Sequence, residues 1–203
     1  MASAEKALQM MTARFEGRTR LSAEDRAALA SLPFEQKTYR MHTYLVREGE
    51  CPRTAKLIIE GLAVRHKVTV EGARQIVSVH MDGDFVDLEG SLLSVADHNV
   101  QALTECRVAQ VPREALVKVI DNHGTLAHAM WLDTLIDASI YRERVVNVGR
   151  RGARQAMCHL LCEIGRRMEI AGIAKSGGYE LPMTQEQLAD SLGITPVHVN
   201  RVL

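Results

Sequence analysis

Four glycines divide the first half of the chain into segments of nearly equal length, and this spacing is the strongest constraint on the fold. They lie 12, 11 and 11 residues apart, at Gly49, Gly61, Gly72 and Gly83. The segments between them are rich in β-branched residues, and residues 64–70 alternate Val or His with Arg, Lys or Thr. Alternation with period two, interrupted by turn residues every 8–12 positions or so, is typical of antiparallel strands in a sandwich or barrel. The sequence therefore predicts an antiparallel β-roll that ends at Pro112, which cannot donate to a ladder.

Helical periodicity flanks the predicted roll on both sides. The first 32 residues have the spacing of two helices, the second starting at Ser22. Residues 124–148 contain neither Pro nor an internal Gly, so a helix there would be about 35–40 Å long. The glycines of residues 149–152 predict a break, followed by another helix over residues 153–170.

The long helix predicted for residues 124–148 carries an apolar stripe, formed by Leu132, Leu135, Ile136 and Ile140. A long helix with one such stripe packs against a second copy of itself in a coiled-coil-like seam, or against its own β-roll. The stripe spans too few heptads to separate these two interpretations. Under the first, these four residues form a homodimer interface.

The C-terminal residues 184–203 have the pattern of a helix-turn-helix. Thr184 and Gln187 form a capping box, and Gly193 stands where a left-handed residue ends a helix. Thr195 is a good N-cap for a second helix, with Pro196 in its first turn. Two short helices joined in this way present a recognition helix to the major groove of DNA. The competing interpretation is an ordinary helical hairpin.

The outer side of this motif supplies the candidate DNA contacts. Arg is suited to bidentate contact with guanine and Asn with adenine, which makes Arg201 and Asn200 the main candidates. The whole expected set is Thr184, Gln185, Thr195, Pro196, Val197, His198, Asn200 and Arg201. Residues 142–203 also hold 9 Lys and Arg against 6 Asp and Glu in a chain of zero net charge, which favours a polyanionic partner.

The order of a glycine-punctuated roll, a long helix and a helix-turn-helix resembles the Crp/Fnr superfamily of bacterial transcription regulators. The resemblance covers about residues 34–203, and its clearest residues are Gly49-Glu50, Gly61, Gly83-Asp84-Phe85 and the stretch from Leu188 to Leu203. It implies a homodimer that binds a near-palindromic operator in double-stranded DNA and contacts RNA polymerase. Arg201 matches the recognition-helix arginine of the family, whereas Val197 stands at its usual glutamate position. Family members continue from this helix into a β-hairpin wing, so we expect weak DNA binding by the 203-residue form.

The expected fold class is therefore α+β, with an N-terminal antiparallel β-roll, flanking helices, a long dimerisation helix and a C-terminal helix-turn-helix whose wing is absent from this chain. We expect a sensor domain over residues 1–121 and the dimerisation helix over residues 122–149. The DNA-binding domain is expected over residues 150–203, incomplete at its C-terminus.

The segment from Asp82 to Glu105 bears on the effector. The cyclic-nucleotide members of the family hold ribose and phosphate with a Glu and an Arg-Ser/Thr pair, and the resemblance places that Arg near Ala96 and its partner near Asp97. The segment contains six acidic residues and no Lys or Arg. A buried phosphate beside uncompensated carboxylates is costly, so the expected effector is not cyclic AMP. The candidate effector pocket comprises Asp87, Leu88, Glu89, Ser91, Asp97 and His98.

The cysteine and histidine content limits other functions. Residues 1–50 contain no cysteine, so the iron–sulfur ligands of another branch of the family are missing. Cys158 and Cys162 are expected to be small buried residues of a helix. No His-x-His exists for a cupin-type metal enzyme, and we expect no catalysis, no metal and no other cofactor. A ligand-binding regulatory module without DNA binding remains the alternative function.

The sequence also indicates where the protein works. No apolar run approaches the roughly 18 residues of a membrane span, and the first residues lack the order of a secretory signal. Four cysteines in a chain of this length do not form a disulfide scaffold. We therefore expect a reduced, cytoplasmic protein that does not interact with membranes.

Overall fold

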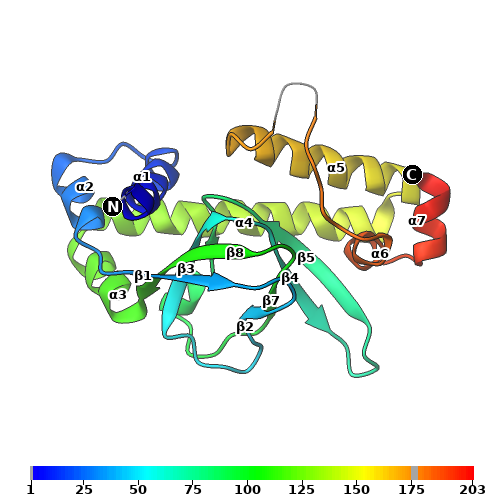
Figure 1. Ribbon diagram of the computed structural model, residues 1–203, viewed down its shortest axis with the longest axis horizontal. Helices are drawn as coiled ribbons and strands as arrows, with labels where there is room; N and C mark the ends of the chain where they lie inside the picture. The colour runs from blue at the N-terminus through cyan, green and yellow to red at the C-terminus, as the bar shows by residue number, and fades with distance from the viewer. Residues whose placement is uncertain (1, 175–177) are drawn as a thin grey trace.

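Two antiparallel sheets form the β-roll of this computed structural model, which describes residues 2–174 and 178–203 (Figure 1). One four-stranded sheet has the order β1-β8-β3-β6, and the other has the order β2-β7-β4-β5. The strands of the first are β1 (Glu35–Tyr39), β8 (Cys106–Pro112), β3 (Thr54–Glu60) and β6 (Phe85–Val86). Those of the second are β2 (Tyr44–Val46), β7 (Asn99–Ala102), β4 (Ala63–Val68) and β5 (Arg74–His80). The α+β fold class and the end of the roll at Pro112 are confirmed.

The glycines of the roll lie where the backbone requires them. Gly61 has φ +113°, and a Cβ there would lie 2.3 Å from the carbonyl oxygen of Glu105, so no larger residue fits. Gly72 has φ +88° in the turn between β4 and β5, where the Thr69 N–H donates to the Ala73 carbonyl at 2.8 Å. A glycine is therefore what allows the chain to reverse at these turns.

Helices precede and follow the roll along the chain. They are α1 (Ala2–Glu16), α2 (Ala23–Ala30), α3 (Arg113–Asn122), α4 (Gly124–Arg150), α5 (Ala153–Ile170), α6 (Gln185–Leu192) and α7 (Pro196–Val202), with a short 3-10 helix η1 (Glu89–Ser91) between β6 and β7. The second helix begins after Ser22 as predicted, and Ser22 forms a capping box with Asp25. The helix break predicted from Gly149 onward is wrong by two residues. A single glycine costs a helix only about 1 kcal/mol, so α4 continues through Gly149 and ends where Arg151 becomes extended.

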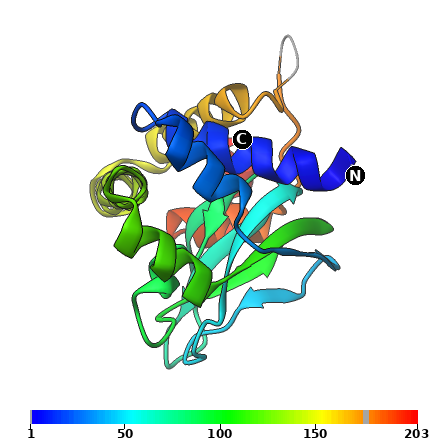
Figure 2. The same cartoon turned by 90° about the vertical axis from the view of Figure 1, so that its left-hand side faces the viewer.

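Helix α4 runs along the length of the molecule, with α1, α2 and α3 near one end and α6 and α7 at the other (Figure 1). Seen along α4, the strands gather on one side of this helix (Figure 2). One apolar core joins α1 to α4 with strands β3 and β8, and a second joins α5, α6 and α7 with β4 and β5. Helices α5, α6 and α7 thus pack directly on the outer face of the roll.

The carboxylate of Asp84 connects these layers. Its Oδ1 lies 2.6 Å from Nη1 of Arg14 on α1, and its Oδ2 lies 2.7 Å from Nη2 of Arg167 on α5. The Met81 N–H donates to the same carboxylate at 2.9 Å. Arg14 Nε reaches Asp133 on α4, at 2.9 Å. Burial alone raises the pKa of Asp84, but the two guanidinium groups outweigh it, so the pKa is lowered.

We expect Asp84→Asn to destabilise the fold by about 3–5 kcal/mol, because it leaves two mostly buried guanidinium groups without their shared charge. The difference in the free energy of unfolding between wild type and variant should have its full value above the ordinary Asp pKa of about 3.9. It should vanish as the pH falls through the lower pKa that Asp84 has in the folded state. Urea unfolding between pH 3 and 7 measures it. The exposed Asp121→Asn serves as the control, and equal stability of the two variants at pH 7 would contradict the prediction.

Candidate nucleic-acid interface and effector pocket

The helix-turn-helix is built by local hydrogen bonds that the sequence specifies. Thr184 Oγ1 accepts from the Gln187 N–H at 3.2 Å, and Gln187 Oε1 accepts from the Thr184 N–H at 2.9 Å. Gly193 ends α6 with φ +65°. Thr195 Oγ1 accepts from the His198 N–H at 3.3 Å, and Pro196 follows in the first turn of α7. The predicted caps, turn and second helix are all confirmed.

The two helices of the motif bury their inner faces and expose the outer one. Leu188, Ala189, Leu192 and Val199 are buried against α5 and the roll, and Val202 is partly buried beside them. All eight residues expected to contact DNA are exposed, including Val197, at 64%, and Arg201. These eight side chains are therefore available to a partner at one end of the molecule (Figure 1).

The helix-turn-helix is fastened to the roll by polar contacts as well. Arg74 Nε on β5 lies 2.7 Å from Asp190 Oδ2, and the Gln75 side-chain amide donates to the Asp190 carbonyl at 2.7 Å. A Cβ on Gly193 would lie 3.1 Å from Val148 of α4. The position of α6 is thus set jointly by β5 and by the end of the long helix.

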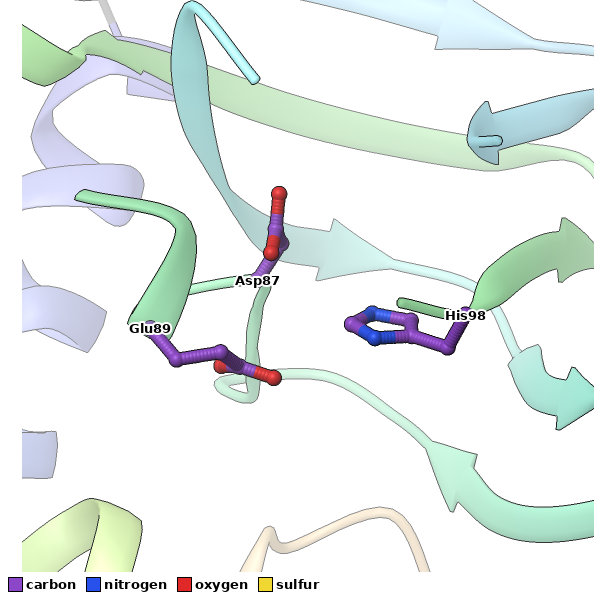
Figure 3. Close-up of side chains that lie close together, drawn as sticks. All are labelled: Asp87, Glu89 and His98. Carbon is purple, nitrogen blue, oxygen red and sulfur yellow. The ribbon is translucent and has the colours of Figure 1, made fainter. Parts of the chain in front are cut away.

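Within the roll, three residues of the expected effector pocket come together. Asp87, Glu89 and His98 each place a ligand atom within 4.8 Å of the others (Figure 3). Asp97 is exposed, but its Oδ1 lies 2.8 Å from His98 Nδ1. Ser91 is buried in η1, and its carbonyl accepts from Arg113. Leu88 is the exception, because it packs into the apolar core beneath α1 to α4.

Two of the six acidic residues of this segment, Asp84 and Glu89, are paired with arginines, which corrects the premise drawn from the sequence. Glu89 Oε1 lies 2.7 Å from Nη1 of Arg65 on β4, and Asp84 is paired with Arg14 and Arg167. The Gly61 N–H donates to Asp82 at 3.0 Å. Each arginine in these pairs lies outside residues 82–105. Counting Lys and Arg within that segment therefore could not reveal the pairs.

Arg65 is a side chain of this pocket that the sequence did not single out. The alternation in residues 64–70 predicts a strand and does not say which of its side chains face the interior. In the structure both faces of the first half of β4 are buried, since α5 and α6 cover the outer face where Val64 packs. Arg65 therefore points into the roll and also donates to the Tyr141 hydroxyl of α4 at 2.6 Å.

Burial controls the protonation of this pocket. Desolvation and the nearby Glu89 carboxylate raise the pKa of Asp87 to about 6. Desolvation, reinforced by Arg65, lowers the pKa of His98 and lowers that of His80 further. Both imidazoles are thus neutral at pH 7.

The expected dimer interface divides between two surfaces. Ile136 and Ile140 line a cavity of about 420 Å³ shared with Arg14 and Arg167, and Leu132 is partly buried. Leu135 instead lies on an exposed face with Trp131 and Val145, whose exposed fractions are 62% and 73%.

The expectation that Cys158 and Cys162 are buried is wrong. Both are exposed, because α5 turns Met157, Leu160 and Ile164 toward the core and leaves the cysteines on the opposite side. Among the described residues, no helix has the length and apolar character of a membrane span.

Comparison with known proteins agrees with this architecture. A family model of the cyclic nucleotide-binding domain matches residues 36–123, and a model of the Crp-like helix-turn-helix domain matches residues 155–203. The transcriptional activator protein FnrL of Cereibacter sphaeroides is 28% identical over 188 residues, which cover 90% of this chain and 73% of FnrL. The transcriptional activatory protein AadR of Rhodopseudomonas palustris is 27% identical over 161 residues, covering 77% of this chain and 64% of AadR, less than two thirds of that relative. The solved structure of FixK2 from Bradyrhizobium japonicum superposes with a TM-score of 0.78 and 25% identity, covering 84% of this chain and 83% of that one.

A β-roll of the cyclic nucleotide-binding type followed by a Crp-like helix-turn-helix defines a DNA-binding transcription regulator. The chain belongs to the Crp/Fnr family of such regulators.

We expect Gly193→Ala to destabilise the protein by about 1–2 kcal/mol, because alanine is strained at φ +65°. The added methyl would also press on Val148 at 3.1 Å. Thermal unfolding measures the effect. Gly149→Ala is the matched control, since its Cβ meets nothing within 4 Å and alanine favours the helix. A Gly193→Ala variant as stable as Gly149→Ala would contradict this account of the turn.

Proposed function

We propose that the protein binds a near-palindromic operator in double-stranded DNA as a homodimer and responds to an effector other than cyclic AMP. The observation that carries this proposal is the orientation of α7. Its inner side is fixed by the fully buried Val199, and its outer side presents Asn200 and Arg201 to solvent. The FnrL and AadR relatives are named as transcriptional activators, which supports a regulatory role in the cytoplasm with RNA polymerase as a further partner.

The alternative is a regulatory module that binds a ligand but no DNA. Such a module has no need of residues 184–203, yet this segment has complete caps, a left-handed turn glycine and exposed polar side chains on one face. A gel-shift selection against random duplexes, carried out with a full-length chain that includes the wing, separates the two functions. Recovery of a symmetric site supports the operator proposal, and the absence of enrichment at low salt favours the alternative.

Arg201→Ala should weaken binding at the selected site by about 1–3 kcal/mol and relax the preference at one base pair in each half-site, because Arg201 would contact a base edge. Titration of fluorescent duplexes carrying each base at that position measures both effects. Arg40→Ala, an exposed arginine in the turn after β1, is the matched control. Unchanged specificity of the Arg201→Ala variant would remove this residue from the interface.

The dimer that we propose is parallel and runs along residues 124–148. The exposed residues Trp131, Leu135 and Val145 lie on a line with Ala138 and Arg142, at alternating spacings of four and three residues. Such spacing is that of a coiled-coil seam. The proposed seam therefore keeps Leu135 of the stripe that the sequence indicated and continues along Trp131 and Val145, whereas Ile136, which is 38% exposed, and Ile140 line a pocket beside Arg14 and Arg167.

Leu135→Glu should convert the dimer to a monomer at micromolar concentration, because it buries an unpaired charge in the seam. Sedimentation equilibrium gives the mass. Val70→Glu, at the fully exposed tip of the β4–β5 hairpin, should leave the dimer intact. A wild-type monomer, or a Leu135→Glu dimer of wild-type affinity, would contradict the proposed seam.

Cyclic AMP should not bind with a dissociation constant in the low micromolar range, which corresponds to about −8 kcal/mol. Arg65, the cation in contact with the pocket carboxylates, is already engaged by Glu89 and Tyr141, and the positions that resemble the family's phosphate site are Ala96 and Asp97. A phosphate there would meet the Asp97 carboxylate, which repels it, in place of the arginine that the family uses. Isothermal titration calorimetry tests this, and a stoichiometric low-micromolar isotherm would refute it.

A further inference from the structure

We propose that Asp87, Glu89 and His98 bind one divalent transition-metal ion inside the β-roll. Their three candidate ligand atoms lie within 4.8 Å of one another, and the Glu89 and His98 side chains extend toward each other with Asp87 beside them (Figure 3). Asp87 and His98 are 1% and 4% exposed, and Glu89 is partly exposed at the open side of the cluster. The proposal replaces our expectation that the chain holds no metal.

Two buried polar atoms of this cluster have no hydrogen-bond partner among the described residues. In the part of the chain that the structure describes, no group lies within hydrogen-bond distance of the buried atoms Asp87 Oδ2 and His98 Nε2. A buried polar atom without a partner costs about 1–3 kcal/mol, so two in one cluster need a ligand that both can bind. A carboxylate oxygen and an unprotonated imidazole nitrogen are both electron-pair donors, and a cation satisfies them together.

Two of the three candidate ligands are oriented by hydrogen-bond partners on the side away from the proposed ion, as is usual for metal ligands in proteins. His98 Nδ1 lies 2.8 Å from Asp97 Oδ1, which fixes the tautomer with Nε2 free for a metal. Metal-binding histidines almost always donate their second N–H to a carboxylate or a carbonyl. Glu89 is oriented by Arg65, which contacts Oε1 at 2.7 Å and leaves Oε2 available. Two of the three ligands therefore have outer partners.

The backbone is also shaped around the Asp87 carboxylate. Asp87 adopts φ +65°, a conformation that L residues rarely hold without a compensating gain. A Cβ on Gly90 would lie 2.6 Å from both Asp87 carboxylate oxygens, and the Gly90 N–H donates to the Asp87 backbone carbonyl at 3.1 Å. Glycine at this position keeps the carboxylate where the other two ligands can reach it.

The donor set indicates the kind of ion. One imidazole and two carboxylates suit Mn²⁺, Fe²⁺ or Zn²⁺, with water completing the coordination. Bond lengths of about 2.0–2.2 Å require the ligand atoms to come within roughly 3–4 Å of one another. The long, partly exposed side chain of Glu89 can make most of this adjustment, and a rotation of the Asp87 or His98 side chain supplies the rest.

An ion at this site would act on the long helix. Arg65 Nη1 contacts both Glu89 and the Tyr141 hydroxyl of α4. Withdrawing negative charge from Glu89 weakens its hold on Arg65 and changes the Arg65–Tyr141 contact. This consequence rests on the proposed DNA-binding function, whereas the metal site itself does not.

The test is a titration of the 203-residue protein with Mn²⁺, followed by electron paramagnetic resonance, and with Zn²⁺, followed by calorimetry. We expect one ion per chain, and electron spin-echo modulation of bound Mn²⁺ should show one directly coordinated imidazole nitrogen. Asp87→Asn and His98→Gln should each lower the affinity by at least 10-fold. The exposed Asp121→Asn and His128→Gln are the matched controls and should bind as wild type does.

The outer-sphere variant Asp97→Asn keeps the test decisive if a buried variant does not fold. Asp97 is exposed, and its loss should lower the affinity about 10–100-fold. No uptake by wild type at millimolar metal, no imidazole coupling, or unchanged affinity of the folded variants would overturn the proposal. These measurements contain no DNA, so their failure is distinct from failure of the operator proposal. A gel shift with and without Mn²⁺ then tests the coupling.

Discussion

The arrangement of the whole chain depends on a single buried carboxylate, that of Asp84. It stands in the turn before β6 and accepts charge-assisted hydrogen bonds from α1 through Arg14 and from α5 through Arg167. Arg14 extends the network to Asp133 on α4. Four elements distant in sequence thus meet at one ion cluster. A buried charge in such a cluster tolerates little movement, because any separation exposes an unpaired charge to a nonpolar interior.

This constraint explains why the DNA-binding helices lie against the roll. Arg167 fastens the C-terminal half of α5 to Asp84, and Arg74 fastens Asp190 of α6 to β5. The apolar residues between these two ion pairs complete the contact, with Ile76 and Val79 of β5 packed beside Leu160 and Leu188. The orientation of α7 is therefore determined by the roll as well as by the hinge at Arg151.

The features that could be predicted from sequence are those fixed by neighbours along the chain. Capping boxes, the left-handed Gly193 and the long helix without Pro each depend on a few consecutive residues, and all were predicted correctly. Arg65, the exposed Cys158 and Cys162, and the division of the apolar stripe depend on which surfaces α5 and α1 cover. Such coverage is a tertiary property, and alternation within β4 could not reveal that both of its faces are buried. The pocket residues around Asp87 and His98 were identified from the resemblance, but their ion partners were not.

The second ion cluster, around Arg65, differs from the first in one respect that matters for regulation. The Asp84 side chain is only 6% exposed and is held by two arginines, whereas the side chain of Glu89, which holds Arg65, is 30% exposed. A ligand can therefore compete for Glu89 more readily than for Asp84. Allosteric coupling between sites needs only about 1–3 kcal/mol. Because Arg65 also binds Tyr141 of α4, an exchange of partners at Glu89 is transmitted to the long helix, while the Asp84 cluster keeps the remaining layers in place.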